Sequence, residues 1–446
     1  MQRFPYSRSL SSLLFVPLLA LGLILTGCDS GGSMEDGEEP DDTIEVPNAY
    51  AFESPFVDGE SAVAYPGQVT RNLLISDLKT LTDGRGPNGS PSSSDLFDRY
   101  EYDSQDLDVL LGTDPSPLQT QYSDIATGKS LKGKATAPYS DQGLIGIGDV
   151  PGFSSGATPD DVITTYLDNI ATNYADGQEA PEAYTTDENV EMSQIVNKLL
   201  LGAVAYSQGT AKYLDDVLNT GDSPNAQDGE NPYSTLGHVW DEAFGYFGAA
   251  REFDAFFDSN GIENALDRNG DGQIDFASEY VYTWADYAYD RGSVGGDFHL
   301  DAWQAFLEGR TAIINQESEQ TIRDHADDAR LAWEKVVAAN TIHYLNSMES
   351  DLSALADDDA ITESNLGQDT AEAFNVHWGE AKPFAWALQF NSDKEISDQQ
   401  LEDLHAALGG TPPYGETKAD AVSDIETART ILQDAYGFSD SNVANW

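Results

Sequence analysis

Cysteine is almost absent from this 446-residue chain, which holds a single one, Cys28. A lone cysteine cannot form an intrachain disulfide, and it cannot supply the several thiolates of a cysteine-rich metal site. The sequence also lacks a His-Glu-x-x-His zinc-protease motif, since none of its six histidines is followed by glutamate. These absences exclude disulfide scaffolds, cysteine-based zinc sites and the commonest metalloprotease signature.

Basic residues are scarce as well. The chain holds 22 Lys+Arg against 78 Asp+Glu, with a formal net charge of −56. Such a field repels the phosphates of nucleic acids and the headgroups of anionic membranes, so neither is an expected partner. Adaptation to strong salt explains this acidity, because the Debye length falls to about 3 Å at 1 M salt. The same composition weakens any argument that rests on acidic clusters alone.

The longest hydrophobic run, Leu13–Leu25, is shorter than the roughly 20 apolar residues of a membrane-spanning helix. Arg3 and Arg8 precede it without any acidic residue, which is typical of an export signal. The stretch Leu-Thr-Gly-Cys that ends at Cys28 resembles the bacterial lipobox. This resemblance implies a signal peptide over residues 1–27 and a lipid on Cys28. An ordinary cleaved signal with an incidental cysteine is the alternative.

Residues 28–49 contain the run DSGGSMEDGEEPDD and show no apolar periodicity. We therefore expect a flexible acidic tether behind the lipid anchor. Acidic residues directly after a lipidated cysteine resemble a surface-export signal of some Gram-negative groups. The expected location is the outer membrane, on its periplasmic side or at the cell surface, and the acidic residues favour the surface.

Helical periodicity dominates the rest of the chain. At Thr158-Pro159-Asp160-Asp161 a capping residue, a proline and two acids predict a helix start. Apolar side chains recur at spacings near 3.6 residues over 187–220, and a second pair of helices is predicted over 300–355. No convincing series of alternating strands is present. We therefore predict an all-α helical bundle.

Two segments share Trp-x-Glu-Ala followed by aromatic residues, His238–Ala250 and His377–Leu388. Each segment follows a pair of predicted long helices and a polar loop. This weak repeat predicts two related half-bundles, about 158–258 and 298–438, within one helical domain over 50–446.

The same two segments carry histidine and glutamate at helical spacing. His238 and Glu242 lie four residues apart, and His377 and Glu380 lie three apart. Both spacings place imidazole and carboxylate on one helix face. Such a face suits a zinc or iron ligand pair or a proton relay, with Asp241 as the nearest additional candidate. The alternative is structural: each carboxylate holds its histidine in place inside the bundle.

The stretch DRNGDGQIDFASE, Asp267–Glu279, has the pattern of a calcium loop between the predicted halves. Gly272 fits the sharp turn at position six, and the acid expected at position twelve is Ser278, with the glutamate one place later. A lone loop predicts a structural calcium ion rather than a sensor. The expected oxygen donors are Asp267, Asn269, Asp271, Gln273, Asp275 and Glu279. A chance acidic turn is the alternative.

Together with this loop, residues 64–81 and 237–248 resemble a family of uncharacterised bacterial lipoproteins related to imelysin, the iron-regulated helical-bundle proteins of the bacterial surface and periplasm. The resemblance covers roughly residue 50 to the C-terminus. It implies an imelysin-like bundle of two similar halves and a role in metal-linked uptake or binding, with no settled enzymatic activity. The imelysin motif Gly-x-His-x-x-Glu is matched at His377 and Glu380 without its glycine, and after Gly237 the spacing differs by one residue.

Three hypotheses for the function follow. The first is an anchored, calcium-stabilised binding lipoprotein for iron or nutrient acquisition, which works with an outer-membrane uptake receptor. The second is a metal-dependent hydrolase centred on the His/Glu residues. The third is a structural or adhesion lipoprotein whose only metal is calcium. We favour the first and assign no catalytic residue. Convergence of the two His/Glu pairs on one open cavity would favour the hydrolase.

Overall fold

Local capping signals set the starts of several helices. Helix α4 (Pro159–Ala175) begins after Thr158, whose hydroxyl accepts the N–H of Asp161 while the Asp161 carboxylate accepts the N–H of Thr158. Ser92 and Asp95 form the same reciprocal pair at the start of α2. Each pair satisfies two backbone N–H groups near the helix start.

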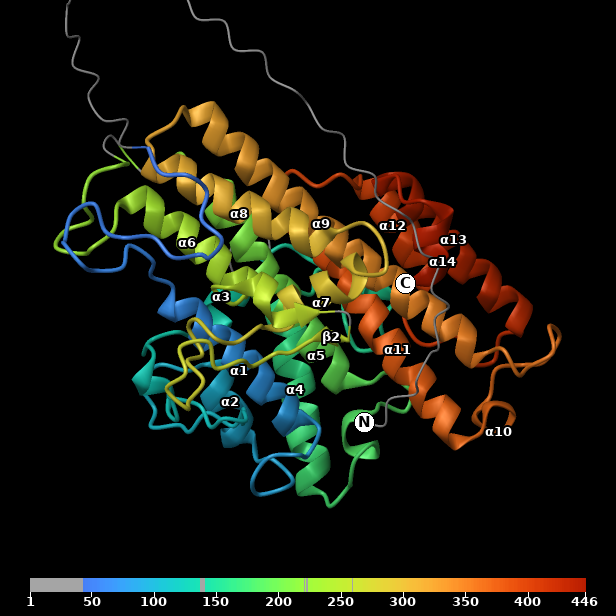
Figure 1. Cartoon of the computed structure of the whole chain (residues 1–446). Helices are drawn as coiled ribbons and strands as arrows, with labels where there is room; N and C mark the ends of the chain where they lie inside the picture. Colours follow the sequence, from blue (N-terminus) through green and yellow to red (C-terminus); the bar gives the residue numbers. More distant parts are fainter. Residues whose placement is uncertain (1–42, 137–140, 220, 222–223, 259) are drawn as a thin grey trace, which may run out of the picture. The chain divides into compact units, whose positions relative to one another are not determined.

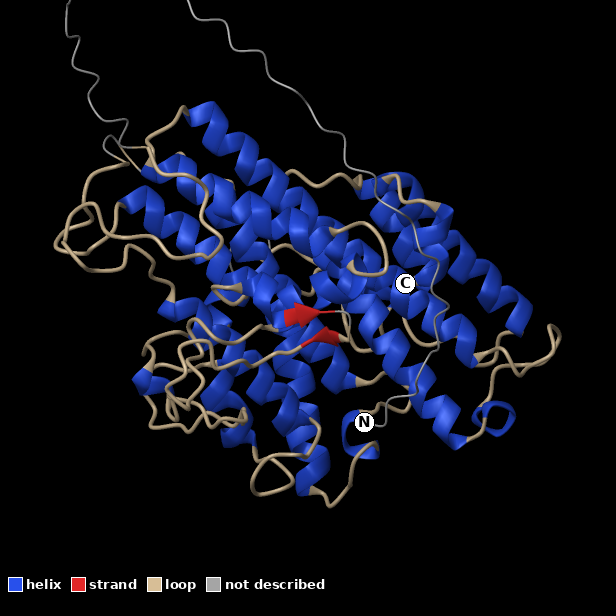
Figure 2. Cartoon of the chain, viewed as in Figure 1, coloured by secondary structure: helices blue, strands red, loops and turns tan. Residues whose placement is uncertain are grey.

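The computed structural model describes residues 43–136, 141–219, 221, 224–258 and 260–446. Helices dominate this part of the chain (Figure 2). The predicted signal peptide, Cys28 and tether residues 28–42 lie outside the described residues. The α-helices are α1 (Pro66–Thr82), α2 (Ser93–Tyr100), α3 (Lys132–Ala135), α4 (Pro159–Ala175), α5 (Met192–Leu200), α6 (Thr235–Phe247), α7 (Thr283–Gly292), α8 (Phe298–Ile314), α9 (Glu319–Asp351), α10 (Glu363–Leu366), α11 (Gln368–Ala387), α12 (Asp398–Leu408), α13 (Lys418–Tyr436) and α14 (Asp440–Asn445).

The predicted all-α class is confirmed. Within the described part of the chain, the named strands are β1 (Phe257–Asp258) and β2 (Gly261–Ile262), which form a short antiparallel pair. None of the described helices combines the length and the apolar composition that a bilayer crossing needs.

Helix α9 is the longest of the described helices and is central to the packing. It packs along both α8 and α11, and α11 also packs on α5 (Figure 1). Helix α6 packs on α1 and α8. The predicted helical pair over 300–355 therefore corresponds to α8 and α9.

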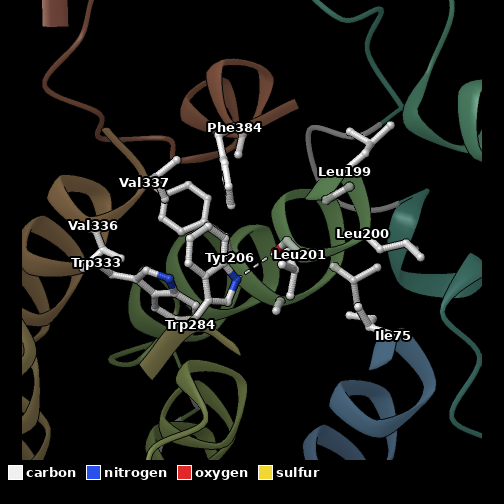
Figure 3. Packing of buried hydrophobic residues seen from close by; sticks show 14 of the residues in the cluster. Ile75, Leu199, Leu200, Leu201, Tyr206, Trp284, Trp333, Val336, Val337 and Phe384 are labelled. Atoms are coloured by element: carbon white, nitrogen blue, oxygen red, sulfur yellow. Dashed lines mark hydrogen bonds between the residues drawn. The ribbon is translucent and has the colours of Figure 1, made fainter. Parts of the chain in front are cut away.

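Aromatic side chains fill the centre of the core where α5, α7, α9 and α11 meet (Figure 3). Trp284 of α7 lies against Trp333 of α9 and Phe384 of α11, with ring centroids 6.1 and 5.5 Å away. The Trp284 indole donates a hydrogen bond of 3.1 Å to the Leu201 carbonyl, so its polar group is satisfied although the residue is 1% exposed.

The helix predicted over 187–220 begins later, at Met192. The Thr186 hydroxyl accepts the N–H groups of Glu188 and Val190, and the resulting turn precedes the helix. Beyond α5 the backbone continues as π-helix, η4 (Leu201–Tyr206) and η5 (Gln208–Leu214). In η5, a Cβ on Gly209 would meet Trp333 at 2.4 Å, so only glycine allows this approach.

Candidate functional site

The acidic loop folds around its own side chains. Asp267 accepts the N–H groups of Gly270 and Gly272 at 2.7 and 2.9 Å. The side-chain oxygens of Asn269 and Asp271 each accept the N–H group two residues further on. Gly270 and Gly272 have φ angles of 76° and 87°, a left-handed conformation that favours glycine. The alternation of acids and glycines therefore specifies a tight series of turns.

A second chain segment holds the loop in place. Ile274 is fully buried; its N–H donates to the Ser116 carbonyl at 3.1 Å, and its own carbonyl accepts the N–H of Leu118 at 2.8 Å. Gln119 donates a side-chain hydrogen bond to Asp275 at 2.7 Å. Residues 116–119 are thus joined to the acidic loop by backbone and side-chain hydrogen bonds.

Glu279 faces the loop. Its carboxylate accepts the N–H groups of Arg268, Asn269 and Asp275 at 2.9–3.0 Å, and the residue is 4% exposed. The Ser278 hydroxyl instead donates to Asp275. Among the described residues, no three His, Cys, Asp or Glu side chains are arranged so that they could hold a metal ion. Calcium ligation by the loop therefore stays a prediction.

On α6, the first His/Glu motif is occupied by contacts to α1 and to the residues just before it. His238 Nδ1 lies 3.0 Å from the Ala64 carbonyl oxygen, and Glu242 accepts a hydrogen bond of 2.9 Å from the Gln68 amide. Asp241 is fully buried, and it accepts hydrogen bonds from Arg310 and from the Tyr50 hydroxyl at 2.9 and 2.8 Å. Burial raises the pKa of Asp241, and the Arg310 guanidinium opposes this rise.

On α11, the second motif divides between two neighbouring helices. His377 Nδ1 lies 2.7 Å from Asp351 of α9, whereas Glu380 lies 3.2 Å from the Lys198 ammonium of α5. The pair Lys198–Glu380 is almost fully buried, and Lys198 also donates to Asn197 at 3.2 Å. Each member of the motif therefore has a partner of its own.

A filled aromatic core lies between the two motifs. Phe247 of α6 contacts Trp333, Trp333 contacts Trp284, and Trp284 contacts Phe384 of α11, with ring centroids 5.3, 6.1 and 5.5 Å apart. The predicted candidates His238, Asp241, Glu242, His377 and Glu380 form no shared metal cluster in the described part of the chain.

A polar groove of about 1120 Å³ lies between α4, residues 178–192 and the start of α11. We call it the α4–α11 groove. Thr165, Asn169 and Asn173 line it from α4, where their spacing of four places them on one face. Asn375 of α11 also lines it. No motif in the sequence indicates this groove, because amides and threonines on a helix are typical of an ordinary solvated face.

The described lining of the groove is acidic and contains no Lys, Arg, His or Cys. Burial is the main cause of a raised pKa at Tyr166, and the charge of Glu188 adds to it. Five carboxylates line the groove: Glu182, Asp187, Glu188, Glu363 and Glu372. Its potential is therefore negative, and any ligand must be compatible with that field.

The segment Gly152–Gly156 has the spacing Gly-x-Ser-x-Gly and lies at the edge of the groove. A nucleophile elbow needs a strand before the serine and a helix directly after it. Residues 151–158 are loop and turn, and no strand precedes them in the described part. The motif is therefore a coincidence of spacing.

One family model matches residues 164–403, which are 240 of the 446 residues. The match runs from α4 into α12, so it includes both His/Glu motifs, the acidic loop and most of the groove. No curated protein and no solved structure matches the chain. The chain belongs to the family described as Domain of unknown function (DUF4856).

Proposed function

We propose that this chain is an anchored binding lipoprotein that takes part in nutrient acquisition. The observation that carries the proposal is the α4–α11 groove, whose volume of about 1120 Å³ and polar lining suit a bound solute. The anchor is a lipid on Cys28 in the outer membrane, and an outer-membrane uptake receptor is the natural partner of such a protein.

The proposal is one of binding. The described lining of the groove includes no histidine, cysteine or lysine, so a histidine-ligated metal hydrolase or a histidine-activated nucleophile does not fit it. The two His/Glu motifs lie elsewhere, and both histidines and both glutamates have protein partners. The proposal therefore places neither iron nor zinc at those motifs.

The proposal retains a distant relationship to imelysin with two related halves. Trp240 of α6 and Trp378 of α11 are both fully buried in the two Trp-x-Glu-Ala segments. Their indoles donate at 3.0 Å to backbone carbonyls, of Phe306 and Leu408 respectively. Other buried tryptophans, such as Trp284, form the same kind of bond, so the support for a common origin of α6 and α11 is the repeated Trp-x-Glu-Ala pattern itself.

Binding in the groove can be tested with a blocking substitution. Asn169 is exposed and lines the groove, so Asn169→Trp should obstruct the groove at its α4 wall without disturbing the core. The neighbouring Asp168 is exposed but does not line the groove, and Asp168→Trp is the matched control. We expect thermal-shift screening of metal chelates, sugars, amino acids, peptides and polyamines to find a solute that stabilises the purified protein and the control but not Asn169→Trp. The absence of any such solute would contradict the proposed function.

Calcium is proposed as a structural ion in the acidic loop. The predicted donors are all oxygens, the ligand type that calcium prefers, and the loop joins residues 116–119 to the rest of the fold. Millimolar calcium should raise the melting temperature by several degrees, because a site at 100 times its Kd adds about 2.7 kcal/mol. Asp271→Ala should remove this rise, whereas Asp168→Ala should keep it. Differential scanning calorimetry with calcium and with EDTA measures both effects.

Two further variants test which side chain completes the calcium shell. Glu279→Gln should weaken calcium binding, because the inward-facing carboxylate loses its charge, while Ser278→Ala should leave the affinity unchanged. Isothermal titration with calcium gives both affinities. Equal melting temperatures of the original chain in calcium and in EDTA would identify the loop as an acidic turn only.

A further inference from the structure

Two polar groups are left without protein partners inside the α4–α11 groove. Tyr166 is 4% exposed and lines the groove, and none of the described residues forms a hydrogen bond with its hydroxyl. Asn375 is 8% exposed; its Oδ1 accepts a hydrogen bond of 2.9 Å from Tyr414, while its Nδ2 has no described partner. Both atoms are open to the groove, since neither is among the buried polar atoms that lack a partner. A ligand or solvent in the groove is the remaining source of a hydrogen-bond partner.

The charge of the lining excludes one large class of solute. Five carboxylates and no Lys or Arg line the described groove, so phosphates, uronic acids and anionic metal chelates would meet repulsion and find no cationic partner. The ligand is therefore neutral or cationic.

Amide side chains separate these two possibilities. The groove is lined by six amides, Asn169, Asn173, Gln178, Asn189, Gln368 and Asn375. An amide both donates and accepts hydrogen bonds, and so does the hydroxyl group of a sugar. Asn173 and Gln368 already donate to the Ala183 carbonyl and to Glu372. A cation such as a polyamine carries only donors, so it offers no acceptor to the remaining amide N–H groups or to the Tyr166 hydroxyl proton. The mixture of groups therefore favours a hydroxyl-rich ligand.

The lining also provides an apolar surface. Phe153 and Tyr166 form an edge-to-face pair with ring centroids 5.3 Å apart, and both line the groove. Tyr166 is 4% exposed, so the half-buried Phe153 ring supplies the surface for the C–H face of a sugar ring while its surroundings bind the hydroxyls. The volume of about 1120 Å³ exceeds the usual 300–1,000 Å³ of small-molecule sites, so it suits several linked units.

We infer that the α4–α11 groove binds a segment of an uncharged oligosaccharide, an inference that rests on the proposed binding function. Amides and carboxylates bind the sugar hydroxyls, the half-buried Phe153 ring contacts a sugar ring face, and the Tyr166 hydroxyl supplies a further hydrogen bond. The acidic field rejects charged glycans that carry uronic acid or sulfate groups.

The test presents the purified protein to an array of neutral and anionic oligosaccharides, followed by isothermal titration of the best neutral hexasaccharide. We expect binding of neutral glycans and none of their uronic-acid counterparts. Tyr166→Phe keeps the ring and removes only the hydroxyl, so affinity should fall about tenfold, the effect of one hydrogen bond of about 1.4 kcal/mol. Asn169→Trp should abolish binding, and Asp168→Trp should bind like the original chain.

Spermine in 1 M salt is the competing probe. Saturable spermine binding that Asn169→Trp abolishes, together with no neutral glycan on the array, would identify a cation site and overturn the inference. A solute of any other class that is lost in Asn169→Trp would also overturn it, while the proposed binding function would stand. If no solute of any class is sensitive to Asn169→Trp, both the inference and the proposed function fail.

Discussion

Asp241→Ala is expected to lower the free energy of unfolding by about 3–5 kcal/mol, the usual effect of breaking a buried ion pair. Asp241 is 0% exposed and Arg310 is 1% exposed, and their atoms Oδ1 and Nε lie 2.9 Å apart. Removal of the carboxylate leaves a guanidinium buried with one described hydrogen-bond acceptor, the Ala62 carbonyl. The Tyr50 hydroxyl and the Ala64 N–H lose their acceptor as well. Urea unfolding followed by circular dichroism measures the loss.

The control for this prediction is an ion pair at the surface. Lys132 and Glu101 lie 2.7 Å apart, with side chains 41% and 48% exposed, so Glu101→Ala should cost less than about 1 kcal/mol. The double variant Asp241→Leu with Arg310→Met should be more stable than Asp241→Ala, because no buried charge is left unpaired. A loss below 1 kcal/mol in Asp241→Ala would show that the pair does not join the segment before α1 to α6 and α8.

The helical class could be predicted because its signals are local. Thr158 and Asp161 lie only three residues apart in the sequence, and they form the cap that starts α4. The start of α5 was harder to predict, because the turn at Thr186 competes with the helix, which therefore begins only at Met192. Nothing in the apolar pattern indicates that α5 continues as π-helix, which depends on packing against distant helices.

From the sequence, the candidate sites could be predicted only where their residues lie on one helix face or within one loop. Spacing places His377 and Glu380 near each other, but it does not show that Asp351 of α9 and Lys198 of α5 are their partners. The groove was out of reach for the same reason, since its lining comes from α4, residues 178–192 and α11. A site whose residues come from distant segments has no characteristic spacing in the sequence by which it could be recognised.

Glu191, the residue that caps α5, gives the second large prediction. Burial raises the pKa of its carboxyl from the ordinary 4.5 to about 7, although the Lys79 ammonium opposes the rise. The unfolded chain therefore releases this proton near pH 4.5, while the folded protein keeps it up to about pH 7. Between these values the unfolded state binds fewer protons, so the contribution of Glu191 to stability falls as the pH rises.

Glu191→Gln should remove this loss. A neutral amide can still accept the N–H of Gln194 that the carboxylate accepts at the start of α5. Near pH 4.5 the variant and the original chain should have the same free energy of unfolding. The variant should become the more stable of the two as the pH rises to 7, and above pH 7 the difference should stay at about 3 kcal/mol, since each unit of pKa corresponds to about 1.4 kcal/mol. Urea unfolding at pH 5, 6, 7 and 8 measures the difference, with the exposed Glu188→Gln as control. Parallel profiles of Glu191→Gln and the original chain would contradict the prediction, because they would mean that Glu191 ionises as easily in the folded protein as in the unfolded chain.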